Sequence, residues 1–198
     1  MARTADKTEQ ARRISQAVWR IMAESGPQGL TLRAVAAEAG CTTGLVLHRF
    51  PDKRSLLVHA RDLLHERTGR EMDELEQHGP PVEVLRGVLR YAASVNPAKR
   101  QEARVRLGYL AAALGDPGLA ERHTTANRAF LARIDRLVAR VRPDWDSRTR
   151  ATAGTALVAL VEGVNTLAVA DPETCSPTTQ EEVIDRALAT FLGQTATA

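Results

Sequence analysis

Residues 30–53, LTLRAVAAEAGCTTGLVLHRFPDK, constrain the fold most strongly because they predict two short helices joined by a tight turn. Thr31 can cap a helix that runs from Leu32 to Ala39, since its hydroxyl can accept a hydrogen bond from a free backbone N–H of the first turn. The apolar residues of this helix recur at helical spacing on one face. Gly40 follows where a left-handed residue ends a helix. The segment therefore predicts a helix-turn-helix.

The second helix of this pair is predicted to run from Thr42 or Thr43 to about Phe50, where Pro51 and Asp52 end it. It begins with Thr-Thr-Gly, which is small and polar. Such a helix end can approach a phosphate or a base edge without steric cost. We therefore expect the start of this helix to face DNA.

Four motifs in this region carry a family resemblance. They are Ala23-Glu24-Ser25-Gly26 at the end of the first helix, Thr31–Gly40, the run from Thr42-Thr43-Gly44 to His48-Arg49-Phe50, and Pro51–Leu57 at the start of the next helix. Together they make residues 13–60 resemble the DNA-binding domain of the TetR (tetracycline-repressor) family. One departure is Leu47, where the family often has Tyr, so a phosphate contact from a hydroxyl is not expected there.

The resemblance and the residue chemistry together give a set of candidate DNA contacts. Hydroxyls and free N–H groups at helix N-termini bind phosphates, and Lys53 matches the family's phosphate-contacting lysine. His48 and Arg49 can reach a phosphate or a guanine edge. The alternative for the threonines is simple helix capping, and for Arg49 a solvated surface side chain. The candidates are Thr31, Arg33, Thr42, Thr43, Gly44, His48, Arg49 and Lys53.

Composition favours an all-α chain. Of the 198 residues, 43% are hydrophobic and only 4% aromatic, and alanine and leucine, which are good helix formers, are abundant. Residues 1–53 hold eight Lys and Arg against five acidic residues, whereas the remainder holds nineteen of each sign. The whole excess of positive charge therefore lies in the segment with the helix-turn-helix, as expected of a surface that faces phosphates.

Periodicity predicts about nine helices, including one at residues 8–25 and a long one at about 52–77. Five more are expected at about residues 81–95, 98–114, 117–141, 146–170 and 178–192. We assign residues 1–53 to an N-terminal helix-turn-helix DNA-binding domain of three helices. Residues 54–198 form a C-terminal helical domain for ligand binding and dimerisation.

Several classes of function find no support in the sequence. No leader peptide and no apolar run of about 18 residues are evident, so we expect a cytoplasmic protein without a membrane span. Cys41 and Cys175 lack metal-ligand spacing, and we expect reduced thiols, no metal and no cofactor. No phosphate-binding loop or catalytic motif of a hydrolase or metalloprotease is present, so no enzyme is expected.

Small residues along 146–170, together with the apolar stripe of 178–192, predict a surface that pairs with its own copy, because small side chains let helices approach closely. A helix-turn-helix usually reads two half-sites through a two-fold dimer. Ordinary packing within one chain is the alternative. The candidate interface residues are Thr152, Thr155, Ala156, Ala159, Gly163, Ile184, Ala187, Leu188 and Phe191.

The C-terminal segments Tyr109–Ala113, Asp116–Leu119 and Leu160–Gly163 resemble the BetI-like subgroup, which includes choline-responsive repressors. Polar residues among apolar helix faces need partners, and they either satisfy one another or line an effector pocket. If the helices from residue 81 to residue 170 surround a cavity, the Glu162 carboxylate would be buried there and would need a partner, which could be a cationic ligand, His123 or an arginine such as Arg104. We therefore prefer a cationic or amphipathic ligand to an anionic one. The candidate pocket residues are Leu89, Tyr109, His123, Asn127, Phe130, Glu162 and Asn165.

We therefore expect a sequence-specific transcriptional regulator, a homodimeric repressor that a small-molecule effector releases from a palindromic operator in double-stranded DNA. Two alternatives stay open. One is an architectural DNA binder with little sequence preference and no effector. The other is a helical small-molecule-binding protein whose helix-turn-helix has lost its affinity for DNA. A palindromic footprint would exclude both.

Overall fold

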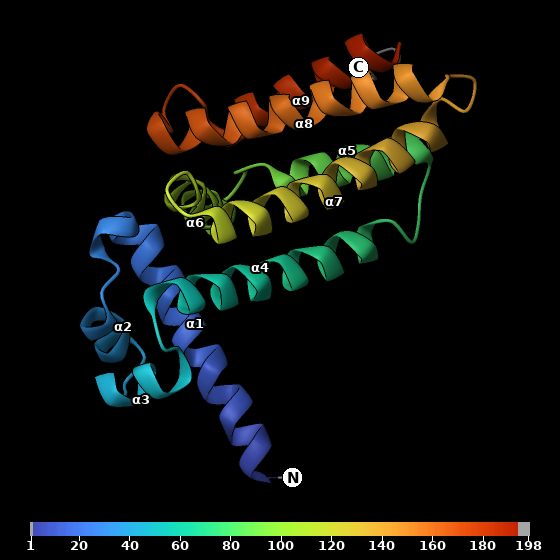
Figure 1. Ribbon diagram of the computed structural model, residues 1–198. Coiled ribbons are helices and arrows are strands. Elements are labelled where there is room, and N and C mark those ends of the chain that lie inside the picture. The colour runs from blue at the N-terminus through green and yellow to red at the C-terminus, as the bar shows by residue number, and fades with distance from the viewer. Residues whose placement is uncertain (1, 194–198) are drawn as a thin grey trace. The chain divides into compact units, whose positions relative to one another are not determined.

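The computed structural model describes the backbone of residues 2–193 and the side chains of residues 8–193. Within this range nine helices follow one another and no strand occurs (Figure 1). They are α1 (Ala2–Gly29), α2 (Leu32–Glu38), α3 (Thr43–Arg49), α4 (Lys53–Leu75), α5 (Pro81–Ala92), α6 (Pro97–Ala113), α7 (Pro117–Val141), α8 (Ser147–Ala170) and α9 (Pro177–Leu192). The all-α prediction is confirmed.

Most helix ends lie within a few residues of their predicted positions, but α1 begins at Ala2 rather than near Thr8. The first helix was predicted to end at residue 25, and the helical backbone is interrupted next to that position, inside the bounds of α1. There Gly26 adopts φ 64° and ψ −169°, which interrupts the helical backbone. A residue with a Cβ adopts this conformation only with strain, so glycine at position 26 turns the chain toward α2.

The chain divides into two compact units. The first contains the residues up to Gly69 together with Arg104–Thr124, and the second contains Arg70–Ala103 together with the residues from Thr125 onward. The chain crosses from one unit to the other inside α4, α6 and α7. The first unit is therefore larger than the segment 1–53 that we assigned to DNA binding, and that functional boundary stays a prediction.

The core of the first unit joins the helix-turn-helix to α1, α4 and α6. Ile14 of α1, Val35 of α2 and Val46 of α3 are each completely buried, and Leu56 of α4 is nearly so. Tyr109 of α6 is packed into the same core. Burying each such side chain contributes about 1.5–3 kcal/mol, so this core holds α2 and α3 firmly on the longer helices.

The core of the second unit lies among α5, α7, α8 and α9. Leu85, Leu137, Leu157 and Ile184, one from each of these helices, have no exposed surface. Figure 1 shows α8 and α9 running side by side, and their packing against one another and against α5 agrees with that view. Helix α5 presents its whole apolar face to this core, so the second unit is a helical bundle.

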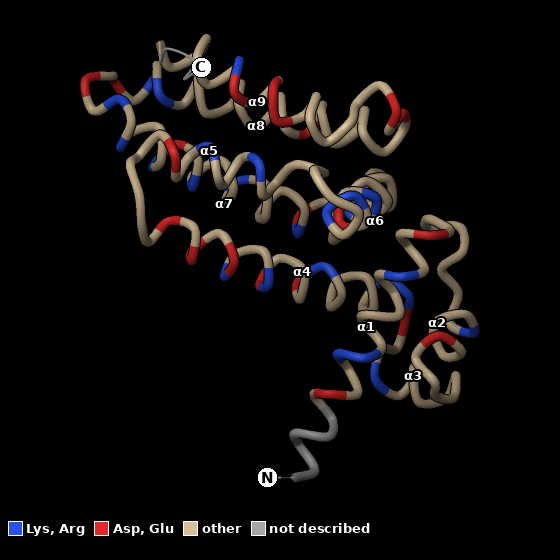
Figure 2. The backbone as a smooth tube through the Cα atoms, turned by 180° about the vertical axis from the view of Figure 1, so that it is seen from behind, with Lys and Arg blue, Asp and Glu red and all other residues tan. Residues whose placement is uncertain are grey.

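Helix α8 is the one described helix that is long and apolar enough to cross a membrane by length and composition, with a mean hydropathy of 1.6 in its most apolar window. Its only charged residues are Arg148, Arg150 and Glu162, and Figure 2 shows most of this helix without charge. Leu157, Val161 and other inward residues pack in the core of the second unit. A core helix of a soluble bundle has the same composition, so the hydropathy is weak support for a span.

Candidate nucleic-acid interface

The two short helices of the helix-turn-helix are each closed at the N-terminus by a threonine. The Oγ1 atom of Thr31 accepts a hydrogen bond from the backbone N–H of Ala34 over 3.1 Å, and that of Thr42 accepts from Leu45 over 3.2 Å. The cap at Thr31 was predicted and is confirmed, and of the two candidates for the second helix, Thr42 and Thr43, the cap is Thr42. Each cap typically contributes about 1 kcal/mol, which matters for helices of seven residues that cannot be stable alone.

The turn between α2 and α3 depends on Gly40, whose φ is 63°. The backbone N–H of Gly40 donates to Ala37 and that of Cys41 donates to Ala36, so the last carbonyls of α2 are satisfied. The guanidinium of Arg13, from α1, donates to the carbonyl oxygen of Ala39 over 2.9 Å. The backbone hydrogen bonds of the turn and the hydrogen bond from Arg13 of α1 together fix the angle between α2 and α3.

The two faces of this element differ sharply. Val35, Ala36, Val46 and Phe50 are buried against the rest of the first unit. The opposite face is exposed, and most of its residues are small, polar or basic. It comprises Thr31, Arg33, Thr42, Thr43, Gly44, Leu47 and His48. Six of these are predicted DNA contacts, and the structure brings them together on one surface, from which side chains can enter a groove of DNA.

Leu47 belongs to the same surface, although we did not select it from the sequence. Its side chain is 44% exposed on α3, which is unusual for a leucine in a helix whose other face is buried. Apolar side chains on a recognition helix can contact the methyl group of thymine. The sequence did contain a sign of this: position 47 has leucine where the TetR family often has tyrosine. That difference removes a hydroxyl but still leaves a large apolar side chain on the outward face of α3.

Arg49 and Lys53 are both engaged within the chain. Nε of Arg49 donates to the side-chain oxygen of Gln10 over 3.2 Å, so this arginine is partly buried and held against α1. Lys53 is exposed at the first position of α4, and its Nζ donates to the carbonyl oxygen of Pro27 over 3.2 Å. The ammonium of Lys53 keeps two further donors, so a phosphate contact and the contact with Pro27 are compatible.

Asp52 closes the N-terminus of α4 beside Lys53. The backbone N–H of Ser55 donates to Oδ1 of Asp52 over 2.6 Å, and the backbone N–H of Asp52 donates to the Ser55 hydroxyl over 3.4 Å. The backbone hydrogen bond from Ser55, and then the side-chain hydrogen bond, lower the pKa of Asp52 below 3.8. Lys53 therefore stands beside an ionised carboxylate that fixes the start of α4.

The predicted effector-pocket residues are divided between the two units. Tyr109 and His123 belong to the first unit, whereas Leu89, Phe130 and Asn165 belong to the second. Leu89 is completely buried in the core, and Asn165 is buried with its amide paired to Ser94 and Ala92. Asn127 is exposed.

Glu162 requires a correction. The preference for a cationic ligand assumed that the helices surround a cavity in which the Glu162 carboxylate is buried. In the structure Glu162 is exposed, because it falls on the outward face of α8 while Val161 and Asn165 fall on the inward face. An exposed carboxylate needs no buried partner, so this argument about the ligand is wrong.

The predicted dimer residues separate into two groups. Thr152, Thr155, Ala159 and Gly163 of α8 are exposed, Ala156 is half-buried, and Phe191 of α9 is 39% exposed. Ile184, Ala187 and Leu188 are instead buried in the core of their own unit. For these three residues the prediction is corrected, because the apolar stripe of α9 is used against α5 and α8 of the same chain.

Among the side chains of residues 8–193, no group of three or more His, Cys, Asp or Glu residues lies close enough together to hold a metal ion. Cys41 and Cys175 are both free thiols, and Cys175 is buried. Burial, followed by the negative charge of Asp171, raises the pKa of the Cys175 thiol above 9.0.

Two family models match this chain. "Bacterial regulatory proteins, tetR family" matches residues 14–60, and "BetI-type transcriptional repressor, C-terminal" matches residues 81–193, which is more than half of the chain. The chain belongs to the TetR family. It is a DNA-binding transcriptional regulator with a BetI-like C-terminal part, and the family is one of regulators rather than enzymes. Helices α2 and α3 thus lie within the segment, residues 14–60, that matches the N-terminal model of the TetR family.

A curated relative and several solved structures are similar to this TetR-family chain. HTH-type transcriptional regulator PksA of Bacillus subtilis (strain 168) is 33% identical over 67 residues, and the match spans about a third of each protein. A transcriptional regulator from Rhodococcus sp. Rha1 has a TM-score of 0.85 at 23% identity, covering 95% of this chain and 98% of that one.

Two solved structures with the same fold hold small molecules. A putative transcriptional regulator from Saccharomonospora viridis, in complex with choline, has a TM-score of 0.83 at 20% identity, covering 91% of this chain and 96% of that one. The SmeT-triclosan complex has a TM-score of 0.77 at 23% identity, covering 96% and 95% of the two chains. At these identities the likeness concerns the fold alone.

Proposed function

We propose that this TetR-family protein is a cytoplasmic homodimeric repressor that binds a palindromic operator and is released from it by a small-molecule effector. The observation that carries the DNA-binding part is the exposed face of α2 and α3, where six predicted contact residues lie together. The buried opposite face fixes this surface on α1 and α4. A rigid reading surface is what sequence-specific binding requires.

On DNA, the residues would divide into two roles. Thr31, Thr42 and Lys53 would bind phosphates, which position the protein without reading sequence. Arg33, Leu47 and His48 would reach base edges in the major groove, since they project from the exposed face of the two helices. Gly44 would let the backbone of α3 come close to the DNA.

The exposed face of α8 supports the dimer. Thr155, Ala159 and Gly163 present a surface of small residues to solvent, although α8 is the most apolar helix of the chain. Two such helices from two copies can pack closely. A two-fold dimer would place two recognition helices one helical turn, or a multiple of it, apart on a palindrome.

The effector part of the proposal draws on the solved structures with the same fold that hold choline or triclosan. Helices α4, α6 and α7 each run through both compact units, so a ligand held by the second unit can bias the position of the first. DNA and effector would then prefer different states, and each would weaken the binding of the other by the same factor.

The proposal is tested by selecting bound sequences from a random double-stranded DNA library and then measuring affinity over a range of salt. We expect an inverted repeat and an affinity that falls steeply with salt, because phosphate contacts release counterions. Recovery of sequences without an inverted repeat would exclude the dimeric operator complex. No retention of DNA at low salt would exclude the function altogether.

A further inference from the structure

A cavity of about 320 Å³ lies in the first unit, beside the turn of the helix-turn-helix. Its walls come from α1, from the turn after α2 and from the start of α3. The lining includes Gln10, Arg13, Ile14, Cys41, Thr42 and Leu45. Small-molecule sites begin at about this volume. This turn cavity belongs to the part of the chain in which the sequence predicted DNA contacts and no ligand site.

The inner lining of the turn cavity is apolar. Ile14 is completely buried, and Ala39, which also lines the cavity, is 6% exposed. Cys41 and Leu45 are half-buried beside them. An apolar group that enters this space leaves water and contacts side chains that the core of the first unit already holds in place. The cavity therefore suits an apolar body.

The polar residues of the lining are Gln10, Arg13 and Thr42, and we call them the polar rim. The guanidinium of Arg13 uses one N–H in its hydrogen bond to the carbonyl oxygen of Ala39 and keeps several more. The side-chain oxygen of Gln10 accepts from Arg49, which leaves the amide NH₂ group to donate elsewhere. Oγ1 of Thr42 accepts from Leu45, so its hydroxyl hydrogen is also available. The polar rim thus offers donors.

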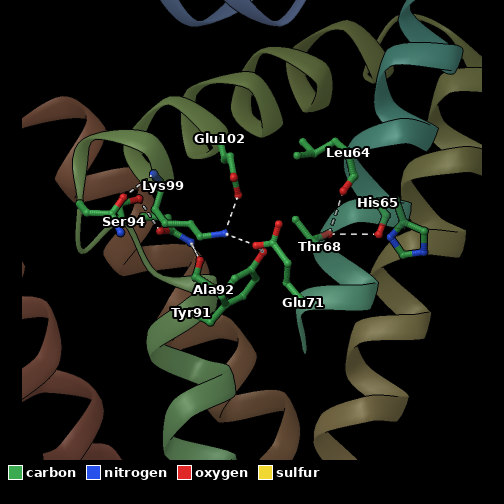
Figure 3. Close-up of polar contacts among 11 residues, drawn as sticks. Leu64, His65, Thr68, Glu71, Tyr91, Ala92, Ser94, Lys99 and Glu102 are labelled. Carbon is green, nitrogen blue, oxygen red and sulfur yellow. Dashed lines mark hydrogen bonds and ion pairs between the residues drawn. The ribbon is translucent and has the colours of Figure 1, made fainter. Parts of the chain in front are cut away.

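Arg13 differs in its surroundings from a sheltered cation of the second unit. Nζ of Lys99 lies 3.4 Å from the ring centroid of Tyr91 and 3.1 Å from Oε2 of Glu102, so its charge is compensated within the protein (Figure 3). Among the described side chains, no carboxylate forms an ion pair with Arg13, and no Asp or Glu lines the turn cavity. A cation with unused donors pairs well with a carboxylate.

We propose that the turn cavity is a binding site for a small organic acid with one carboxylate and an apolar body. The carboxylate accepts hydrogen bonds from Arg13 and from the other donors of the polar rim. The apolar body lies against Ile14 and Leu45. An inorganic anion would satisfy the rim but would leave the apolar space unfilled, so the site favours the organic acid.

Such a ligand would oppose DNA binding. Thr42 lines the turn cavity and is also one of the proposed phosphate contacts. A carboxylate beside Thr42 repels the like charge of a DNA phosphate and uses the hydroxyl that the phosphate needs. This antagonism rests on the proposed function of Thr42, whereas the binding site itself does not.

The first test follows the alkylation of Cys41 by iodoacetamide, read by peptide mass spectrometry, with buried Cys175 as the internal reference. Saturating 3-phenylpropanoate should suppress alkylation of Cys41 and leave that of Cys175 unchanged. The uncharged 3-phenyl-1-propanol should need about a ten-fold higher concentration or more, because it lacks charge-assisted hydrogen bonds. No protection by 3-phenylpropanoate, or equal protection by the alcohol, would overturn the proposal. Equal protection by inorganic phosphate would reduce the polar rim to a contact for the DNA backbone.

Variants of α1 identify the group that binds the carboxylate. Arg13→Gln should weaken protection by 3-phenylpropanoate about ten-fold or more, and Arg13→Lys, which keeps the charge, should weaken it less. Arg12→Gln removes the same charge from the neighbouring exposed position, outside the lining, and should have no effect. If Arg13→Gln does not fold, Gln10→Leu takes its place, because it removes rim donors and keeps the bond from Arg13 to Ala39. Equal effects of Arg12→Gln and Arg13→Gln would contradict the site.

A second assay measures the affinity of the wild type and of Arg13→Gln for the selected operator by fluorescence anisotropy. Saturating 3-phenylpropanoate should weaken binding by the wild type and leave that of Arg13→Gln nearly unchanged. Protection of Cys41 without any loss of DNA affinity would overturn the antagonism and leave the site in place. A wild type that binds no DNA would contradict the proposed function, and the alkylation result would not be affected.

Discussion

The hydroxyl of Ser94 donates a hydrogen bond to Oδ1 of Asn165 over 2.6 Å, although 71 residues separate them in the chain. The amide nitrogen of Asn165 in turn donates to the carbonyl oxygen of Ala92 over 3.0 Å, and the side-chain oxygen of Gln180 accepts from the backbone N–H of Ser94 over 2.9 Å. Ser94, Asn165 and Gln180 are all almost completely buried. This network joins the end of α5 to α8 and α9.

Replacing Asn165 with leucine should therefore destabilise the protein by about 2–4 kcal/mol. The change keeps the volume of the side chain but removes the hydrogen-bond partner of the buried Ser94 hydroxyl and the hydrogen bond to the Ala92 carbonyl. An unpaired buried group costs about 1–3 kcal/mol, and a lost hydrogen bond costs about 0.5–1.5 kcal/mol. Urea denaturation followed by circular dichroism measures the difference. Asn127→Leu, at an exposed position of α7, is the control. Losses of equal size in the two variants would show that the network contributes nothing specific.

Lys53→Ala should weaken binding to all DNA sequences alike and reduce the slope of affinity against salt by about one counterion, as the loss of a phosphate contact does. Gel shifts with the operator and with unrelated DNA over a range of salt measure both effects. The control is Arg140→Ala, at an exposed position of α7 outside the helix-turn-helix. It should leave both the affinity for DNA and its dependence on salt unchanged. A loss confined to one base position of the operator would instead assign Lys53 to base recognition.

Stability should fall as the pH decreases from about 6.5, because His59 resists protonation in the folded protein. Its ring lies 5.3 Å from that of Phe50, and burial lowers its pKa below 6.5, against the opposing charges of Asp62 and Glu66. The unfolded chain takes up a proton at a higher pH than the folded chain does, so acid favours unfolding from 6.5 down to the folded pKa.

The corresponding measurement is the free energy of unfolding from pH 7.5 to pH 5 for the wild type and for His59→Gln. The variant should show a weaker dependence on pH in this window, whereas His78→Gln, in an exposed loop, should follow the wild type. A pH dependence that is identical in His59→Gln and in the wild type would mean that another group is responsible.

Ala159→Arg should convert the proposed dimer to monomers, because it places a long charged side chain in the middle of the exposed small-residue face of α8. Light scattering gives the mass, and operator binding should fall to that of a single half-site. Ala132→Arg, at an exposed position of α7, should remain dimeric. An unchanged mass for Ala159→Arg would place the interface on another surface.

The sequence was sufficient for features that depend on neighbours in the chain. The cap at Thr31 and the turn at Gly40 lie where they were predicted, Thr42 is one of the two predicted candidates for the second cap, and the helical backbone is interrupted at Gly26, next to the predicted end of the first helix at residue 25. Each depends on the conformational preference of one residue or on a hydrogen bond that spans three or four residues. Such local preferences can be recognised in a single sequence. Helical spacing also indicated which residues of the helix-turn-helix face outward.

Tertiary structure decided which helix each apolar or polar face would meet. Periodicity showed that Ile184 and Leu188 share a stripe, but a stripe that meets its own chain looks the same as one that meets a second copy. Similarly, Asn165 proved to be a buried, paired group and Glu162 an exposed one, although both are polar residues of one apolar helix. The approach of Lys99 to Tyr91 depends on how α5 and α6 pack. Such pairings are set by long-range packing of several helices at once, for which helical spacing alone carries no information.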